Sequence, residues 1–314
     1  MLNFLVPYGI NKFLLNFLVP YGINKFEERN MNYNFREDLI AIREILGLTQ
    51  EELAEQLDVE KKTILRTEGG QTEPTLKLLD HIYTYAFEKK IKINKLKELF
   101  WLDNLKSNHK LLYHGSKSKI EGELSVRIGR VNNDFGQGFY AGESYEQAIS
   151  FVSGFEKPSV YYLDFDEQNL KYKKYEVNQE WMMTIAYYRG VLEEYEDHPI
   201  VKSLIEESRN CDYIIAPIAD NRMFQIINSF IAGEITDEQC KHCLAATHLG
   251  FQYVFISDKA IKQVKLIERC YISNNEKEYY KNIRTEDTKS GDDKVKLAKR
   301  QYRGKGKYID EILG

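Results

Sequence analysis

The sequence predicts a multidomain chain, in which an all-α bundle is followed by an α+β domain. Its 314 residues exceed the length of one average domain. Apolar residues recur at helical spacing through residues 36–82, whereas residues 111–267 mix short apolar strands with helices. Hydrophobic residues make up 43% of the chain and charged residues 29%, which is typical of a globular protein and excludes wholesale disorder.

Charge and cysteine content narrow the class of protein further. The formal net charge is −4, divided as −2 over residues 36–100, −7 over 111–270 and +3 over 271–314. This pattern lacks the broad basic surface of a strong non-specific DNA binder. Four cysteines are too few for a disulfide scaffold, so we expect a reducing cytosol. No apolar run approaches the roughly eighteen residues that span a bilayer.

The first thirty residues contain a perfect tandem copy. Residues 2–13 and 15–26 both read LNFLVPYGINKF, and a proline interrupts each apolar run, unlike a signal peptide. We expect residues 1–30 to be a duplicated leader rather than native structure, with translation starting at Met31. The alternative is a genuine N-terminal arm, and the intact mass of the natively expressed protein decides between them.

Residues 31–105 are predicted to form a helix-turn-helix domain and a linker helix. A helix over 36–46 ends at Gly47, and Thr49 with Glu52 forms a capping box at the start of the second helix. A third short helix covers 60–68, and another follows from Leu76. We then expect a single linker helix over 86–105 and a polar joint at 106–110.

The stretch GLTQEELAEQLDVEKKTILRTEGGQTEP resembles the Cro/repressor-type helix-turn-helix family over about residues 36–100. In that family the third helix enters the major groove of DNA. The resemblance implies that Gln50, Lys61, Lys62 and Thr63 face DNA. Glu60 departs from the family pattern, because a carboxylate there repels phosphate, although it can accept a hydrogen bond from cytosine. Binding to DNA and docking to a protein partner both stay open.

The α+β domain is expected over residues 111–270. Its predicted strands and helices follow one another in short segments. The strands are 111–116, 139–141, 160–165, 213–218, 252–256 and 264–267, and the helices are 144–151, 235–246 and 258–263.

Three motifs of this domain resemble the ADP-ribosyltransferase fold of the diphtheria-toxin and poly-ADP-ribose-polymerase branch. They are HGS at 114–116, GQGFYA at 136–141 and the late strand QYV at 252–254. DFGQGFYA, DYIIAPIADNRM and FQYVFISDKAI more closely resemble the bacterial uncharacterised-domain family numbered 3990, over about 111–267. The resemblance implies NAD-dependent mono-ADP-ribosyl transfer to an unknown macromolecule, with a toxin–antitoxin or defence setting and a protein partner encoded nearby.

The same resemblance implies roles for several residues. His114 hydrogen-bonds a ribose hydroxyl of NAD, while Gly115 lets the backbone approach the carboxamide and Ser116 adds a hydroxyl. Tyr140 stacks on the nicotinamide ring and Tyr145 flanks its other face.

Gln252 stands where the resembled fold usually carries Glu. An amide orients a ribose hydroxyl but cannot act as a general base, so chain-building is disfavoured. Mono-transfer with a base from elsewhere and NAD binding without turnover both stay open. Gly138 belongs to the glycine pair of the cofactor loop. Arg130 either meets the pyrophosphate or forms a surface salt bridge, and Asp220 is either the missing carboxylate or a helix cap.

Two remaining features are read as structural. Cys240 and Cys243 are helical neighbours without a second CxxC, so we expect no metal. The tail, 275–314, is expected to be charged and partly flexible, with a link at 289–293. The alternative to an enzyme is a DNA-binding transcriptional regulator whose second domain senses NAD or ADP-ribose without turnover, and a third reading is an interaction protein. No membrane partner is expected.

Overall fold

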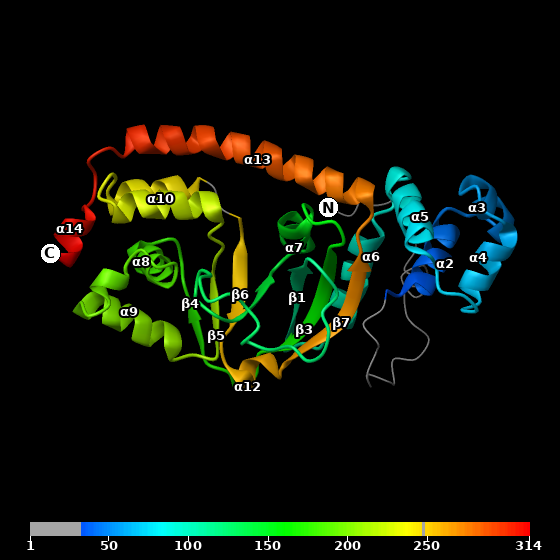
Figure 1. Ribbon diagram of the computed structural model, residues 1–314, viewed down its shortest axis with the longest axis horizontal. Helices are drawn as coiled ribbons and strands as arrows, with labels where there is room; N and C mark the ends of the chain where they lie inside the picture. Colours follow the sequence, from blue (N-terminus) through cyan, green and yellow to red (C-terminus); the bar gives the residue numbers. More distant parts are fainter. Residues whose placement is uncertain (1–32, 247–248) are drawn as a thin grey trace. The chain divides into compact units, whose positions relative to one another are not determined.

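The computed structural model describes residues 33–246 and 249–314 (Figure 1). The expected duplicated leader and Met31 lie outside the described residues. The chain divides into two compact units. The described part of the first unit comprises residues 33–121, 148–164 and 266–281, and that of the second comprises 122–147, 165–246, 249–265 and 282–314. The helix-turn-helix region therefore shares a unit with strands that were expected to belong to the α+β domain.

From Tyr33 onward, where the described chain begins, the N-terminal part of the first unit is helical. The capping box predicted at Thr49 and Glu52 is present: Glu52 N donates to Thr49 Oγ1 over 3.2 Å, and Thr49 N donates to Glu52 Oε2 over 2.7 Å. Fully buried Leu39, Leu53 and Ile64 belong to the core between the helices. The helices are α2 (Phe35–Ile45), α3 (Gln50–Gln56), α4 (Lys61–Glu68), α5 (Leu76–Glu88) and α6 (Ile93–Asn104).

The single linker helix expected over 86–105 is wrong. The chain leaves α5 after Glu88 and starts α6 at Ile93. Lys90 between them has a φ of 64°, in the left-handed region, which ends an α-helix. Ile91 is buried in the helical core, so the interruption serves to bring its side chain inward.

A buried ionic cluster joins the helices of the first unit to its last strand. Lys97 Nζ, on α6, lies 2.5 Å from Asp38 Oδ2 on α2 and 3.2 Å from Glu268 Oε1. Tyr83 donates a hydrogen bond to Asp38, and Asn34 Nδ2 donates to both oxygens of Glu268, over 3.1 and 3.0 Å. Each charge has a partner, as a buried charge requires.

The strands of the first unit are β1 (His109–Ser116), β3 (Ser159–Asp166) and β7 (Val264–Tyr271), in the order β1-β3-β7. β3 buries Ser159 to Leu163 without alternation, which indicates a strand covered on both faces. α7 (Tyr145–Val152) contributes its second half to this unit.

The second unit contains strands in the order β4-β5-β6-β2. β4 (Tyr172–Lys174) runs parallel to β5 (Tyr213–Pro217), and β6 (Phe251–Phe255) runs antiparallel to both β5 and β2 (Phe139–Gly142). The register places Gln252 of β6 between Ala216 and Gly142.

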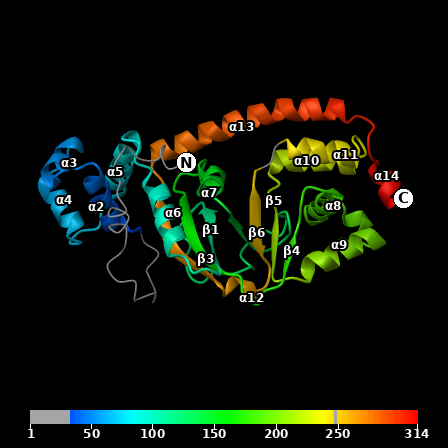
Figure 2. The same ribbon diagram turned by 180° about the vertical axis from the view of Figure 1, so that it is seen from behind.

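Helices pack against these strands around a core that includes Trp181, Phe230 and Val254. Figures 1 and 2 show α8, α9 and α10 grouped beside the β4-β5-β6 edge. Thr236 is the N-cap of the helix that was expected over 235–246, and it forms a capping box with Gln239. The helices are α8 (Gln179–Tyr188), the 3₁₀ turn η3 (Glu193–Tyr195), α9 (Pro199–Arg209), α10 (Asn221–Ile231), α11 (Asp237–Ala245), α12 (Asp258–Ile261) and α14 (Ile309–Leu313).

The flexible link expected at 289–293 lies inside a long helix, α13 (Asn274–Gln301). Its second half is held by side chains from α10 and α11, which donate to its backbone. Arg222 Nη1 donates to Thr288 O over 2.8 Å, and Gln239 Nε2 donates to Lys299 O over 2.9 Å. These contacts are remote in sequence, so composition did not reveal them. None of the described helices, α13 included, is long and apolar enough to cross a membrane.

Candidate functional site

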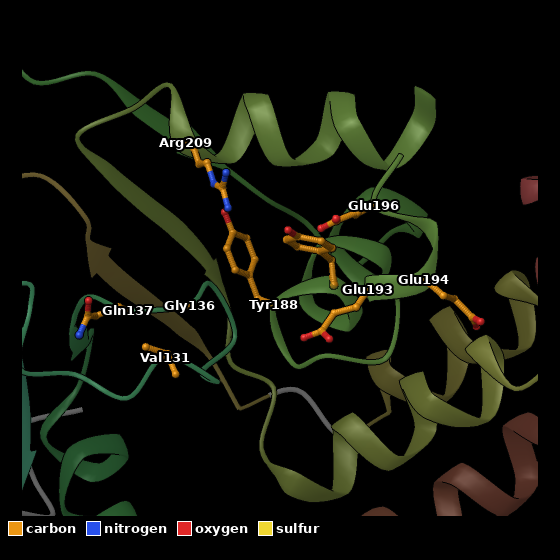
Figure 3. A pocket seen from close by; sticks show the side chains of 9 residues that line it. Val131, Gly136, Gln137, Tyr188, Glu193, Glu194, Glu196 and Arg209 are labelled. Carbon is orange, nitrogen blue, oxygen red and sulfur yellow. The ribbon is translucent and has the colours of Figure 1, made fainter. Parts of the chain in front are cut away.

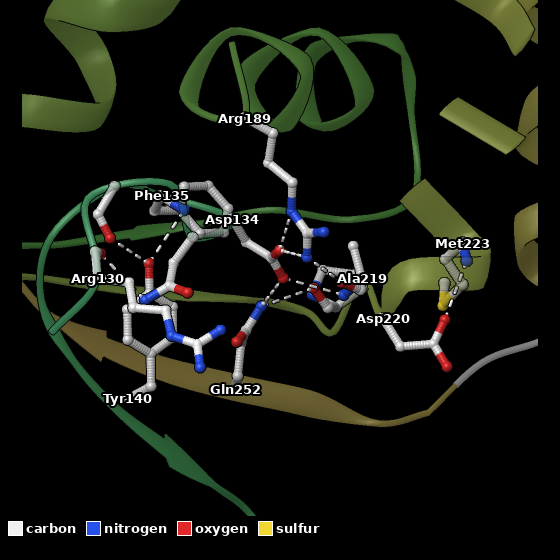
Figure 4. Close-up of polar contacts among 12 residues, drawn as sticks. Arg130, Asp134, Phe135, Tyr140, Arg189, Ala219, Asp220, Met223 and Gln252 are labelled. Carbon is white, nitrogen blue, oxygen red and sulfur yellow. Dashed lines mark hydrogen bonds and ion pairs between the residues drawn. The ribbon is translucent and has the colours of Figure 1, made fainter. Parts of the chain in front are cut away.

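Asp134 is the centre of a buried polar network in the second unit (Figure 4). Its carboxylate accepts four hydrogen bonds. Oδ1 accepts from Arg189 Nε over 3.0 Å and also from Arg189 Nη2. Oδ2 accepts from Gln252 Nε2 over 2.7 Å and from Ala219 N over 3.1 Å. This network joins the loop before β2 to α8, β6 and the segment after β5.

Arg189 completes the charge balance of this network. It is the C-cap residue of α8, and its Nη2 also donates to Ala219 O over 2.6 Å. Its guanidinium lies 4.7 Å from the centre of the Phe224 ring, close enough for a cation–π contact. The buried carboxylate of Asp134 therefore has both a counter-charge and enough donors to offset its desolvation.

Gln252 enters the network from β6 and is 7% exposed. Its Nε2 donates to Asp134 and, over 3.3 Å, to Pro217 O. Since both amide protons are used, the side-chain oxygen Oε1 is the atom that can accept a hydrogen bond from a ligand. In Figure 4 this oxygen is turned away from Asp134, toward the side of Arg130 and Tyr140.

Tyr140, on β2, is tied to the loop that carries Asp134. Its hydroxyl donates to Gly136 O over 2.7 Å and accepts from Phe135 N over 3.1 Å. Burial raises the pKa of Tyr140 well above its ordinary value, so the phenol stays protonated. Gly136 has a φ of 72°, and a Cβ there would lie 2.9 Å from Tyr188, so the turn requires glycine.

The structure thus brings Tyr140 and Gln252 into one unit with Asp134 and Arg189. Sequence reasoning did not single out the latter two. The available signals were the position of Asp134 directly before the glycine pair and that of Arg189 at a helix end before Gly190.

His114, Gly115 and Ser116 lie on β1 in the first unit and are partly exposed. A Cβ on Gly115 would lie 2.5 Å from Ala148 O and 2.8 Å from Val152 Cγ1. Gly115 therefore has a packing reason to be glycine, in addition to the role implied by the resemblance.

The other expected cofactor contacts have mixed outcomes. Tyr145 is fully buried, so its ring presents no face to a ligand and that expectation is corrected. Asp220 is the N-cap of α10, where its Oδ1 accepts from Met223 N over 2.9 Å, as the helix-cap reading predicted. Gly138 packs on β6, where a Cβ would lie 2.8 Å from Phe255 O. Arg130 is exposed.

A separate open pocket of about 660 Å³ lies in the second unit (Figure 3). None of the sequence-predicted site residues lines it. It shares Gly136 with the loop of Asp134, and three glutamates give it an acidic wall. Its lining is Val131, Gly136, Gln137, Tyr187, Tyr188, Glu193, Glu194, Glu196 and Arg209.

The predicted DNA-facing residues differ in their contacts. Gln50 Nε2 donates over 2.7 Å to Glu68, so this side chain has a structural partner within the helical bundle. Lys61 is exposed and pairs with Glu51 over 2.8 Å. Lys62 is exposed and Thr63 partly exposed on α4. The exposed side of α4 thus carries the cations that could meet phosphates.

Cys240 and Cys243 are core residues of the second unit. Their sulfurs lie 3.6 Å from Ile226 O and 3.7 Å from Val295 O, respectively. Burial raises the pKa of both thiols, which favours the protonated form that does not bind metal. Within residues 33–246 and 249–314, no group of three or more His, Cys, Asp or Glu is placed to hold a metal ion.

Comparison with protein families covers both regions. Residues 110–266 match the model of a family described as protein of unknown function (DUF3990). The chain belongs to this family. The DUF3990 match extends from β1 into β7 and includes Asp134, Tyr140, Arg189 and Gln252. Residues 39–81 match a helix-turn-helix model, which indicates a DNA-binding regulatory module. No curated protein and no solved structure matches the chain.

Proposed function

We propose that the DUF3990 domain is an NAD-dependent mono-ADP-ribosyltransferase and that the helix-turn-helix module regulates it or its synthesis. The observation that carries the proposal is the setting of Gln252. This residue stands at the position that carries Glu in the resembled fold. Its amide donates to Asp134 and to Pro217 O, which fixes the orientation of the amide and leaves its oxygen to accept from a ligand. Tyr140, whose ring is proposed to stack on nicotinamide, lies two residues away from Gly142, the β2 partner of Gln252.

In the proposed reaction, the bond between ribose C1′ and the nicotinamide nitrogen breaks and its electron pair leaves with nicotinamide. A nucleophilic atom of the acceptor forms the new bond to C1′ and releases its proton to solvent. Within the second unit we assign a ribose hydroxyl to Gln252 and the nicotinamide ring to Tyr140. The role of His114 toward a ribose hydroxyl is carried over from the resemblance alone. Holding the ribose while positive charge develops at C1′ is the contribution that such a site makes.

We propose single transfer rather than chain building. The amide of Gln252 cannot accept a proton from an incoming hydroxyl. Asp134 does not replace it as a base, because all four of its hydrogen bonds are to protein donors. The four free cysteines suit a reducing cytosol, where we place this activity. A toxin–antitoxin or defence setting, with a protein partner encoded nearby, belongs to the same proposal.

The test is nicotinamide release from NAD by the full chain, with cell lysate as the source of acceptor. The His114→Ala variant should lose release. His242→Ala is the matched control, because this imidazole lies on α11 and stacks on Tyr302. The proposal fails if the wild-type chain releases no nicotinamide, or if His114→Ala releases as much as His242→Ala.

A second candidate function is a non-enzymatic transcriptional regulator that senses NAD or ADP-ribose. The helix-turn-helix match and the exposed Lys62 and Arg66 on α4 favour it. It predicts NAD binding without turnover, together with a sequence-specific footprint on duplex DNA that weakens as salt rises.

A further inference from the structure

We propose that Asp134 is a positioning residue, which holds and polarises the Gln252 amide so that the amide oxygen takes the place of a carboxylate oxygen toward a ribose hydroxyl. This inference rests on the proposed function. It makes Gln252 a member of a hydrogen-bonded pair rather than the remnant of a lost glutamate.

The first support is that only one amide orientation fits. Gln252 Nε2 lies 2.7 Å from Asp134 Oδ2 and 3.3 Å from Pro217 O, and both of these atoms are acceptors. Rotating the amide by 180° would put its oxygen against two acceptors, at an electrostatic cost. The pairing therefore fixes Oε1 as the atom that can meet a ligand.

The second support is the way in which Asp134 is held. Arg189 binds Oδ1, whereas Gln252 and Ala219 N bind Oδ2. The carboxylate is therefore locked in place, with one oxygen directed at the amide. A donor that binds a carboxylate makes a charge-assisted hydrogen bond, and such a bond shifts electron density onto the acceptor end of the amide. Oε1 then becomes a stronger acceptor than an isolated amide oxygen.

Exchanging the two functional groups tests the pairing. In Gln252→Glu a carboxylate faces Asp134, and the two must share a proton to coexist. In Asp134→Asn a neutral amide replaces the carboxylate. The Gln252 amide then loses its charged acceptor, and Arg189 loses its counter-ion. In the double variant the new amide at position 134 can donate to the new carboxylate at position 252 and accept from Arg189, which retains the formal charge and the hydrogen bond between the two side chains. Ala219 N then loses its acceptor and the new carboxylate faces Pro217 O, so the exchange restores only part of the network.

The measurements are NAD affinity by calorimetry, nicotinamide release and thermal unfolding, all on the full chain. We expect each single variant to bind NAD about tenfold or more weakly, and the double variant to bind more tightly than the sum of the two single losses predicts. The NAD affinity of Gln252→Glu should rise as the pH falls, because a proton shared between the new carboxylate and Asp134 restores the hydrogen bond. The wild type should lack this pH dependence. A merely structural role of Asp134 would produce no such difference between variant and wild type.

Asp212→Asn is the matched control. Asp212 is a carboxylate of the same unit that accepts from Lys171 N and Ser257 Oγ, over 2.9 and 2.8 Å, so its loss should lower stability and leave NAD affinity unchanged. Additive losses in the double variant, with binding by wild type intact, would overturn the positioning role and leave the proposed function standing. Absence of NAD binding by the wild-type chain would overturn both.

Discussion

Replacing Lys97 with methionine should destabilise the first unit severely. Lys97 is 6% exposed, and its ammonium lies between Asp38 and Glu268, whose side chains are 1% and 5% exposed. Methionine fills a similar volume but leaves two buried carboxylates facing each other without the cation. Breaking a buried ion pair by removing one partner costs about 3–5 kcal/mol, a large part of the roughly 5–15 kcal/mol that stabilises a domain.

The control is Lys61→Met, which removes an exposed pair. Lys61 and Glu51 lie 2.8 Å apart, with side chains 53% and 62% exposed, so water screens their attraction and the loss should stay below about 1 kcal/mol. The assay is urea unfolding of the full chain, monitored by circular dichroism. The free energies of unfolding are compared between variants whose free energy depends equally steeply on urea concentration. If Lys97→Met lost no more free energy of unfolding than Lys61→Met, the buried cluster would contribute no stability and the reasoning would fail.

The direction in which the pKa of Lys97 is shifted decides the pH at which the two variants should be compared. Burial lowers the pKa of Lys97, but the carboxylates of Asp38 and Glu268 outweigh it and raise the pKa above its ordinary value. A raised lysine pKa gives stability that is fully present below the unfolded value, about 10.4, and is lost as the pH rises through the folded value. The full contribution of Lys97 is therefore measured at neutral pH.

Two further variants address the proposed functions. Tyr140→Phe keeps the ring but leaves the Phe135 N–H and the Gly136 carbonyl without their hydroxyl partner, so it should cost about 1–3 kcal/mol of unfolding free energy. Its NAD affinity should fall much less than that of Tyr140→Ala. Equal NAD affinities of the two variants in calorimetry would remove the ring from the site. Lys62→Glu on α4 should weaken duplex DNA binding and reduce its salt dependence. The control Lys77→Glu changes an exposed charge on α5 and should leave DNA binding unchanged. If gel shifts at several salt concentrations showed equal losses of DNA affinity in the two variants, α4 would be excluded as the DNA-facing helix.

The elements with local signals were predictable from the sequence. Caps and stops are made by residues within three or four positions of one another, so Thr49 with Glu52, Gly47 and Thr236 all mark helix ends that the structure confirms. The strands around Tyr113, Tyr161 and Val254 were also recognisable as short apolar runs.

Features that depend on remote partners were missed. The interruption between α5 and α6 follows from burying Ile91 in the helical core, and the continuity of α13 follows from its contacts with Arg222 and Gln239. Asp134 was overlooked for the same reason, because its partners Arg189 and Gln252 lie 55 and 118 residues away in sequence. Periodicity and motif spacing carry no information on such pairs.

The division of the chain links the two candidate functions. His114, on β1, belongs to the same compact unit as the helix-turn-helix, and the Lys97 cluster fastens α2 and α6 to Glu268 of β7. The proposed DNA-facing helix α4 and His114 therefore belong to one compact unit. Excising residues 31–105 as a separate DNA-binding domain would strip Glu268 from Lys97 and Asn34, so the two activities are best measured on the intact chain.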